Sequence, residues 1–301
     1  MQDAHEFMAV LLNALHEELN LAPPKPTAAA APPASAVRAG EESKSADSSP
    51  PFDPASAARL HWSDFESRNT DVFSHLFYGQ SAQYVICSTC RTASCNHHVM
   101  GQLTLDIPHS PAKRTAAAAY SRLAPPPSPY APVTLSQCLS TALVADNLED
   151  YLCSSCKSKQ PAITSVYFTT LPPILLIQLK RFDMAATLGG FSARSHKDDT
   201  PCEYPLELDA SPLLQPHPSV IQSLRVPPYV MSPGPSGLRY RLVGVVRHHD
   251  DHYTAFCRVR DVRVGGAEAW GYFNDSKTFI ETEEDVLGHQ QNVYLLIYQR
   301  A

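Results

Sequence analysis

Two Cys-x-x-Cys pairs constrain this chain more than any other feature of its sequence. Cys87-Ser-Thr-Cys90 and Cys153-Ser-Ser-Cys156 each form a short turn that can present two thiolates to one side. Two such turns supply the four soft ligands of a tetrahedral structural zinc ion, so the two segments are expected to meet in the fold. Four free thiols, or one redox-active pair, are the alternatives to zinc. A closed four-thiolate site would fasten strand tips and leave no open position for catalysis.

Composition and charge narrow the class of protein. A chain of 301 residues that is 44% hydrophobic and 18% charged can bury a substantial core. It holds 24 Lys and Arg against 30 Asp and Glu, for a net charge of -6, and has no basic run that would neutralise a row of phosphates. We therefore expect no nucleic-acid partner.

The sequence shows no sign of a membrane or secreted protein. Its longest apolar run near the end, residues 293–298, is far too short to cross a bilayer, and the first residues are acidic rather than basic and then apolar. Four of the eight cysteines lie in the two pairs, which favours reduced thiols and a metal over disulfides. We expect an intracellular protein of the cytoplasm, the nucleus or both, with no membrane partner.

Proline divides the chain into packed segments and biased stretches. The 27 prolines crowd into three stretches that also hold most of the alanine and serine. Residues 22–58 cannot offset the entropy of ordering and are expected to be disordered, residues 111–132 form a second insertion, and residues 183–237 form an irregular third one. The folded parts are then residues 1–21, 59–110, 133–182 and 238–301.

Hydrophobic periodicity predicts mixed helical and strand structure. Residues 2–20 fit an amphipathic helix, which Asp3 and Glu6 would start as a capping box. Residues 60–79 and 134–148 fit helical or mixed segments. Apolar runs predict strands, with an antiparallel sheet near the C-terminus, at residues 84–86, 163–168, 174–182, 240–246, 253–259, 270–273 and 293–298.

A histidine and an amide lie at the ends of two predicted strands. His252 begins one strand, and Asn274 and Asp275 stand at the end of the next. An amide or carboxylate beside an imidazole holds the ring in one tautomer through its second nitrogen, which is how a general base is oriented. Alternatively, His252 is a hydrogen-bonded polar residue without a catalytic role, or residues 248–252 form a hairpin tip or an incidental metal site.

Five stretches taken together resemble the ubiquitin-specific protease family, peptidase C19, and they occur in that family's order. The resemblance covers the chain from residue 2 to about residue 299, apart from the three insertions. The stretches are residues 2–7 (Gln-Asp-Ala-His-Glu-Phe), Phe77-x-Gly79 with the first cysteine pair, the second cysteine pair, residues 171–182, and His252-Tyr253 with residues 273–276.

The resemblance implies a papain-like α+β cysteine protease fold, described as thumb, palm and zinc-binding fingers. Residues 1–21 would be a remnant of the thumb, residues 59–110 and 133–182 would form fingers and palm, and residues 238–301 would form the palm with the histidine box. One structural zinc ion, held by the four paired cysteines, and no organic cofactor would be expected.

The resemblance also implies thiol-dependent hydrolysis of the isopeptide or peptide bond at the C-terminal Gly of ubiquitin. Ubiquitin and ubiquitinated proteins would be the partners. His252 would be the general base that ionises a cysteine, Asn274 would orient it, and Asp275 would support or replace Asn274. Asp3 and Glu6 would border the channel for ubiquitin's arginine-bearing tail, a role compatible with helix capping.

Two departures from the family pattern carry expectations of their own. The family's cysteine box, an Asn-x-Gly-Asn-Thr-Cys-Tyr type segment, is missing upstream of residues 2–7, so the chain as given is expected to be inactive. Cys257 cannot replace it, because five residues of strand put it about 16 Å from His252 and on the opposite face. Asp251 stands where the family has Gly and would favour a charged imidazole.

These departures leave two readings besides a working enzyme. The first is a non-catalytic ubiquitin-binding protein or scaffold that keeps the palm and fingers. The second is a zinc-ribbon nucleic-acid binder, which the acidic charge balance disfavours.

Overall fold

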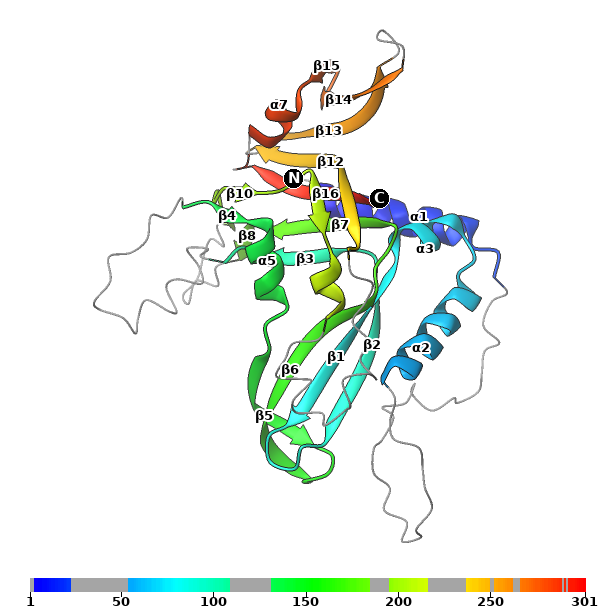
Figure 1. Cartoon of the computed structure of the whole chain (residues 1–301), viewed down its shortest axis with the longest axis vertical. Helices are drawn as coiled ribbons and strands as arrows, with labels where there is room; N and C mark the ends of the chain where they lie inside the picture. Colours follow the sequence, from blue (N-terminus) through cyan, green and yellow to red (C-terminus); the bar gives the residue numbers. More distant parts are fainter. Residues whose placement is uncertain are drawn as a thin grey trace, which may run out of the picture.

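The computed structural model describes residues 3–22, 54–108, 131–184, 195–215, 237–249, 252–261, 266–288, 290 and 292–301. In this part of the chain a long four-stranded sheet projects from a broader eight-stranded sheet, with helices beside both (Figure 1). The expected α+β class is therefore confirmed.

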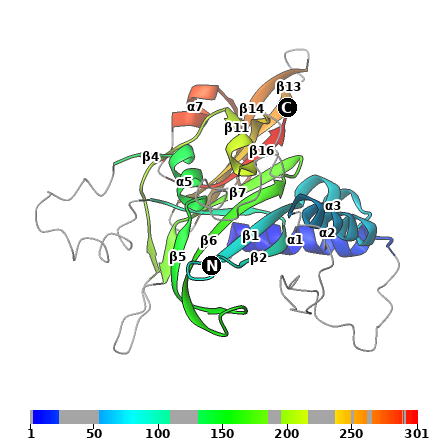
Figure 2. The same cartoon turned by 60° about the horizontal axis from the view of Figure 1, so that its bottom comes forward.

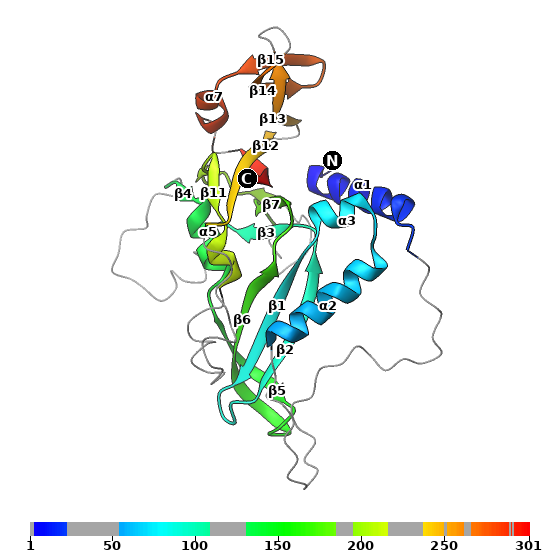
Figure 3. The same ribbon diagram turned by 45° about the vertical axis from the view of Figure 1, so that its right-hand side comes forward.

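The four-stranded sheet forms the expected fingers and is built from two long hairpins. Its strand order is β2-β1-β6-β5, and every neighbouring pair is antiparallel. Ala82, Tyr84 and Ile86 of β1 pack with Tyr167 of β6 in a small core of their own. The turns that join β1 to β2 and β5 to β6 meet at the far end of this sheet (Figure 3). Its strands are β1 (Gly79–Cys87), β2 (Ala93–Met100), β5 (Asp146–Cys153) and β6 (Ser158–Thr170).

The eight-stranded sheet forms the palm and contains the predicted C-terminal antiparallel sheet. Its order is β15-β14-β13-β12-β16-β7-β3, with β11 paired to β12, and only β3 with β7 is parallel. β16 lies between β12 and β7 and is buried along most of its length, which accounts for its nearly continuous apolar run. The strands are β3 (Leu103–Asp106), β7 (Ile174–Lys180), β11 (Glu207–Asp209), β12 (Arg239–His249), β13 (His252–Asp261), β14 (Ala267–Asn274), β15 (Lys277–Glu281) and β16 (Val293–Arg300).

Short elements close the core of the palm. The capping box of Thr134 and Gln137 starts α5, which buries Leu135, Cys138 and Leu139 against the palm strands. The short elements are β4 (Val133–Thr134), α5 (Leu135–Ala142), β8 (Phe182–Met184), β9 (Ser195–Lys197), β10 (Cys202–Glu203), η1 (Ser211–Leu214) and α7 (Glu283–Gly288).

A buried arginine ties these short elements to the sheet. Arg181 follows β7 and is only 1% exposed. Its guanidinium donates to the carbonyl oxygen of Val293 and, at 2.7 and 2.9 Å, to those of Asp198 and Thr200. A buried cation needs such acceptors to offset its lost hydration, so this one side chain fixes where three segments cross.

Three helices, α1 (Ala4–Leu19), α2 (Pro54–Arg68) and α3 (Val72–Phe77), gather on one side of the molecule (Figure 2). α1 and α3 are joined by His16, whose Nδ1 lies 2.7 Å from Asp71 Oδ2 and 3.0 Å from Ser74 Oγ. α2 lies beside the fingers, where His61 Nδ1 is 2.7 Å from the side-chain amide of Gln80 (Figure 3).

The predicted amphipathic helix is present, but most of its apolar face is exposed within the described residues. No residue of α1 is buried, and the side chains of Phe7 and Val10 are 66% and 63% exposed. Met8, Leu12 and Leu15 are half-buried, and polar contacts at both ends also hold α1 in place.

The structure differs from the sequence expectations in two of the biased stretches. α2 begins at Pro54, so residues 54–58 are helical although the expected disordered stretch included them. Residues 195–215 were expected to be irregular, yet they form β9, β10, β11 and η1, because β10 pairs with β4 and β11 with β12. Most of the three insertions lies outside the described residues. Among the helices that are described, none has the length and apolar character to span a bilayer.

Candidate functional site

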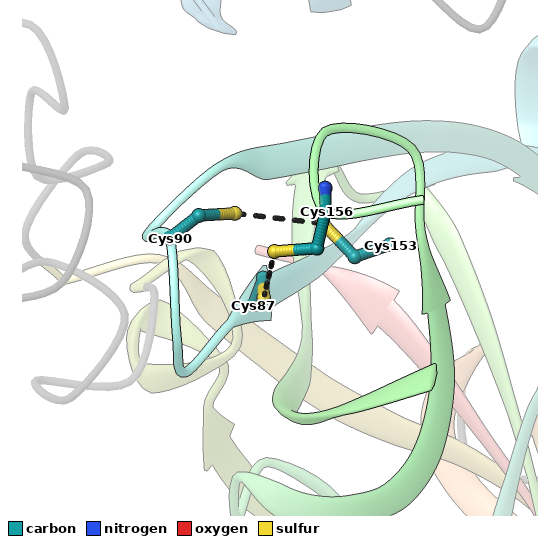
Figure 4. Close-up of side chains that lie close together, drawn as sticks. All are labelled: Cys87, Cys90, Cys153 and Cys156. Carbon is teal, nitrogen blue, oxygen red and sulfur yellow. Dashed lines mark hydrogen bonds between the residues drawn. The ribbon is translucent and has the colours of Figure 1, made fainter. Parts of the chain in front are cut away.

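The four paired cysteines meet at the tip of the fingers, as the sequence predicted (Figure 4). Cys87 Sγ lies 4.0 Å from Cys156 Sγ, and Cys90 Sγ lies 3.5 Å from Cys153 Sγ. All four sulfur atoms lie within 4.8 Å of one another. A zinc ion with Zn–S bonds of about 2.3 Å needs sulfur–sulfur edges of about 3.8 Å, so this cluster has the size of a tetrahedral metal site.

The two cysteine turns share one backbone conformation. Arg91 and Lys157, each directly after the second cysteine of its pair, have positive φ angles of 60° and 57°. Their amides donate to the carbonyl oxygens of the first cysteines, at 3.0 Å for Arg91 and 2.9 Å for Lys157. This matched geometry turns both thiols of each pair toward the other pair, which four unrelated thiols would not require.

Hydrogen bonds shift the pKa values of two thiols of the cluster in opposite directions, and the one with Cys90 raises the pKa of Cys156 to about 12. The Thr92 hydroxyl lies 3.3 Å from Cys90 Sγ, and hydrogen bonds from the Thr92 side chain and backbone lower the pKa of the Cys90 thiol to about 6. Cys87 and Cys153 are buried, which shields two of the ligands from solvent. Four thiolates would complete the coordination of one metal ion, so the site suits a structural rather than a catalytic role.

His252 and Asn274 meet across the edge of the palm, as the sequence predicted. His252 begins β13 and Asn274 ends β14, and the antiparallel register of these strands makes the two residues diagonal neighbours. His252 Nε2 lies 2.7 Å from Asn274 Oδ1. The Asn274 amide nitrogen donates to the Tyr272 hydroxyl at 3.2 Å, which fixes the amide with its oxygen toward the imidazole.

This geometry assigns the two ring nitrogens of His252. An amide oxygen can only accept a hydrogen bond, so Nε2 must carry the proton. Nδ1 of the neutral ring then holds the lone pair and is the atom that can take a proton from a thiol. The pair therefore has the arrangement of a general base with its orienting group.

Asp275 lies beside this pair but in a different setting. Asn274 pairs with Lys277, so Asp275 and Ser276 form a two-residue hairpin turn, and Asp275 has a positive φ of 50°. Its side chain is exposed to solvent. The amide of Asn274 is the group bonded to His252, and a supporting role for Asp275 remains a prediction.

Asp3 is the N-cap of α1 and Glu6 lies in its first turn, and the two side chains have different surroundings. The Asp3 carboxylate caps α1 by accepting from the His5 amide at 2.8 Å, so the Asp3 half of the predicted capping box is present. It also accepts from the Tyr294 hydroxyl of β16. Glu6 is exposed. The first turn of α1 therefore lies against the palm.

Two tyrosines lie where the first turn of α1 meets the palm, and the sequence did not reveal their role. Tyr294 is 2% exposed, and its oxygen also accepts from the Gln178 side-chain amide at 2.9 Å. Tyr253 follows His252, and burial raises the pKa of its hydroxyl, which lies near the Ala4 backbone. A polar-tipped aromatic residue within a buried strand is a usable signal, because its hydroxyl needs a partner.

The four other cysteines lie in the palm core or in strands. Cys138 and Cys202 lie in the palm core, and burial raises the pKa of Cys95 to about 11. Cys257 faces Gly244 and Gly271 across the neighbouring strands, and burial raises its pKa. All eight cysteines belong to the described part of the chain, and none of them there forms a hydrogen bond with His252. The expectation about Asp251 lies outside the described residues.

Comparison with known proteins gives one consistent family. The family model described as ubiquitin carboxyl-terminal hydrolase matches residues 1–298. Human ubiquitin carboxyl-terminal hydrolase 3 is 28% identical over 99% of this chain, which covers 48% of that protein. Ubiquitin carboxyl-terminal hydrolase 4 of Saccharomyces cerevisiae (strain YJM789) is 26% identical over all of this chain, which covers 29% of that protein.

Solved structures show the same fold. A Ubp8/Sgf11/Sus1/Sgf73 DUB module of SAGA superposes with a TM-score of 0.64 at 22% identity, covering all of this chain and 51% of the other. The same kind of module bound to ubiquitin aldehyde gives a TM-score of 0.59 at 21% identity, covering all of this chain and 50% of the other.

The chain belongs to the ubiquitin carboxyl-terminal hydrolase family. It has that family's palm, with a histidine and an asparagine paired at its edge, and fingers that end in a four-cysteine cluster. It spans 48% of the human relative's length and 29% of the yeast relative's length.

Proposed function

We propose that this protein is a deubiquitinase, which hydrolyses the isopeptide or peptide bond at the C-terminal Gly of ubiquitin. The observation that carries the proposal is the 2.7 Å contact between His252 Nε2 and Asn274 Oδ1, at the edge of a palm built as in this family. Ubiquitin and proteins that carry it are the partners. The protein acts inside the cell, where thiols stay reduced.

His252 serves as the general base of the reaction. Its Nδ1 removes the proton of a cysteine thiol, and the thiolate attacks the carbonyl carbon of the scissile bond. The proton then passes from His252 to the departing amine, which leaves an acyl-enzyme that water hydrolyses. Asn274 keeps the ring in the required tautomer throughout, and Asp275 is a secondary partner.

The nucleophilic cysteine comes from outside these 301 residues. Within the described structure four cysteines form the cluster at the tip of the fingers, and the other four lie in the palm core or in strands. None of the eight forms a hydrogen bond with His252 there. We expect the 301-residue chain by itself to be inactive. The same observation favours a second candidate function, in which the protein binds ubiquitin without cleaving it.

The fingers and the first turn of α1 hold ubiquitin. One zinc ion at the four-cysteine cluster joins the two hairpin tips, so the fingers keep a fixed shape without taking part in the chemistry. The carboxylates of Asp3 and Glu6 face the arginine-bearing tail of ubiquitin. An arginine pairs with a carboxylate by charge-assisted hydrogen bonds, which would align the tail along the palm.

Ubiquitin with a C-terminal electrophile tests this proposal together with ubiquitin binding. The full-length natural protein should form one covalent adduct seen by mass spectrometry, whereas the 301-residue chain should form none but should bind ubiquitin in calorimetry. Binding without any adduct in either protein would favour the non-catalytic function. Absence of binding in both would refute both functions.

A further inference from the structure

A chain of hydrogen bonds runs through the palm and ends on the Asp3 carboxylate. The Thr104 hydroxyl of β3 donates to Gln178 Oε1 of β7 at 3.2 Å, and the Gln178 amide nitrogen donates to the Tyr294 oxygen at 2.9 Å. The Tyr294 hydroxyl in turn donates to both oxygens of Asp3, at 2.8 and 2.7 Å. Because every donor points the same way, each bond polarises the next toward the carboxylate.

The Tyr294 hydroxyl donates its hydrogen to Asp3. Its oxygen already accepts from Gln178, so the hydroxyl hydrogen is committed to Asp3. Burial and the hydrogen bond to Asp3 raise the pKa of Tyr294, so the hydroxyl stays protonated throughout the physiological pH range. Tyr294 is a permanent donor that holds the Asp3 carboxylate in one orientation.

The carboxylate held in this way is still open to a cation. Its other donor is the His5 amide, and a carboxylate offers about four acceptor positions. Asp3 is half-buried, and within the described residues no Lys or Arg forms an ion pair with it. Its charge is therefore stabilised by neutral donors alone, and part of its acceptor capacity is free.

The same contact fixes Asp3 relative to the general base. Tyr253, whose hydroxyl lies near the Ala4 backbone, directly follows His252 on β13. Tyr294 lies beside Tyr253, with 6.2 Å between the ring centroids. The first turn of α1 is tied to the palm by Tyr294, through Asp3, and by Gln102, whose side-chain amide contacts His5.

We propose that Tyr294 is a positioning residue for the substrate tail. Its hydroxyl aims the Asp3 carboxylate at the cationic tail of the modifier and keeps it at a set distance from His252. This inference rests on the proposed function and adds to it a residue of β16 that touches neither the tail nor the reacting atoms.

Tyr294→Phe tests the role in the full-length protein, because it removes the hydroxyl and keeps the ring. Calorimetry should show a Kd for ubiquitin about three- to tenfold higher, the loss expected for one hydrogen bond. KM for a fluorogenic ubiquitin amide should rise by the same factor, with kcat within about twofold. For ubiquitin whose tail arginines are replaced by alanine, the variant and the wild type should bind equally.

Tyr298→Phe is the matched control. Tyr298 lies on the same strand, is fully buried and donates its hydroxyl to the Pro205 carbonyl oxygen at 2.7 Å, away from α1. This variant should lower the melting temperature and leave the Kd unchanged. Gln178→Met, which removes the donor behind Tyr294, should raise the Kd in the same direction and serves if Tyr294→Phe does not fold.

The outcomes separate this inference from the proposed function. A Tyr294→Phe protein that binds ubiquitin as tightly as the wild type overturns the inference alone. An equal loss for ubiquitin with and without its tail arginines shows a merely structural tether and also overturns it. A wild-type protein that does not bind ubiquitin overturns the proposed function, and the inference with it.

Discussion

Replacing Asn274 tests how the general base is oriented. Asn274→Ala removes the 2.7 Å bond to His252 Nε2 and frees the ring to rotate or change tautomer. When His252 has taken up the thiol proton, this bond joins a charged donor to the amide oxygen, and such bonds contribute about 1.5–3 kcal/mol. At about 1.4 kcal/mol per factor of ten, kcat/KM should fall by about ten- to a hundredfold.

A fluorogenic ubiquitin amide with the full-length protein provides the assay for this prediction. Asn274→Asp keeps an acceptor for the Nε2 proton of His252, so part of the activity should remain. Asp275→Ala is the variant for comparison and should lose less activity than Asn274→Ala, because Asp275, the proposed secondary partner, is exposed and Asn274 contacts His252. A larger loss in Asp275→Ala than in Asn274→Ala would refute this assignment.

Three further predictions concern the fold. Cys153→Ser should remove one zinc per chain in metal analysis and lower the melting temperature. Cys95→Ser, in the same sheet but outside the cluster, should keep the metal. Full metal content in Cys153→Ser would contradict the proposed metal site. Arg181→Met should lower the unfolding free energy in urea by about 3 kcal/mol or more, since buried carbonyls lose a charged donor, and a loss below about 1 kcal/mol would disprove this role. Burial, with Arg68 and His98 nearby, lowers the pKa of His61, so the unfolded state binds more protons than the folded state. The free energy of unfolding should therefore fall as the pH drops below 6.5. His61→Gln should flatten this pH dependence, and an unchanged slope would count against the role of His61.

The site residues that the sequence predicted are those fixed by local rules. The cysteine pairs could be recognised because metal ligands come in short turns, and the two hairpins bring the turns together. His252 and Asn274 could be paired because they stand at the ends of successive strands of one antiparallel sheet. Both predictions needed only the positions of the cysteine, histidine and asparagine residues relative to the predicted strands.

The residues that the sequence did not reveal depend on contacts between distant segments. The bond from Tyr294 to Asp3 joins residues 291 positions apart, and no periodic pattern shows where α1 will lie on the palm. Arg181 is similar, because its carbonyl partners come from two other segments. β2 was missed because its many polar residues hide the alternation, and it forms through its backbone pairing with β1.

The apolar face of α1 marks the limit of periodicity as a guide. The pattern identified the helix correctly, but Phe7 and Val10 of its apolar side are exposed in the described structure, whereas Met8 and Leu12 are half-buried. Periodicity states which residues share a face, and it does not state what the face packs against.

Cleavage of an isopeptide bond between ubiquitin and lysine by the full-length protein tests the role of His252 most directly. His252→Ala should lower the initial rate at least about a hundredfold, the usual contribution of a general base, and leave the Kd for ubiquitin unchanged. A His252→Ala protein that cleaves the bond as fast as the wild type would contradict the assignment.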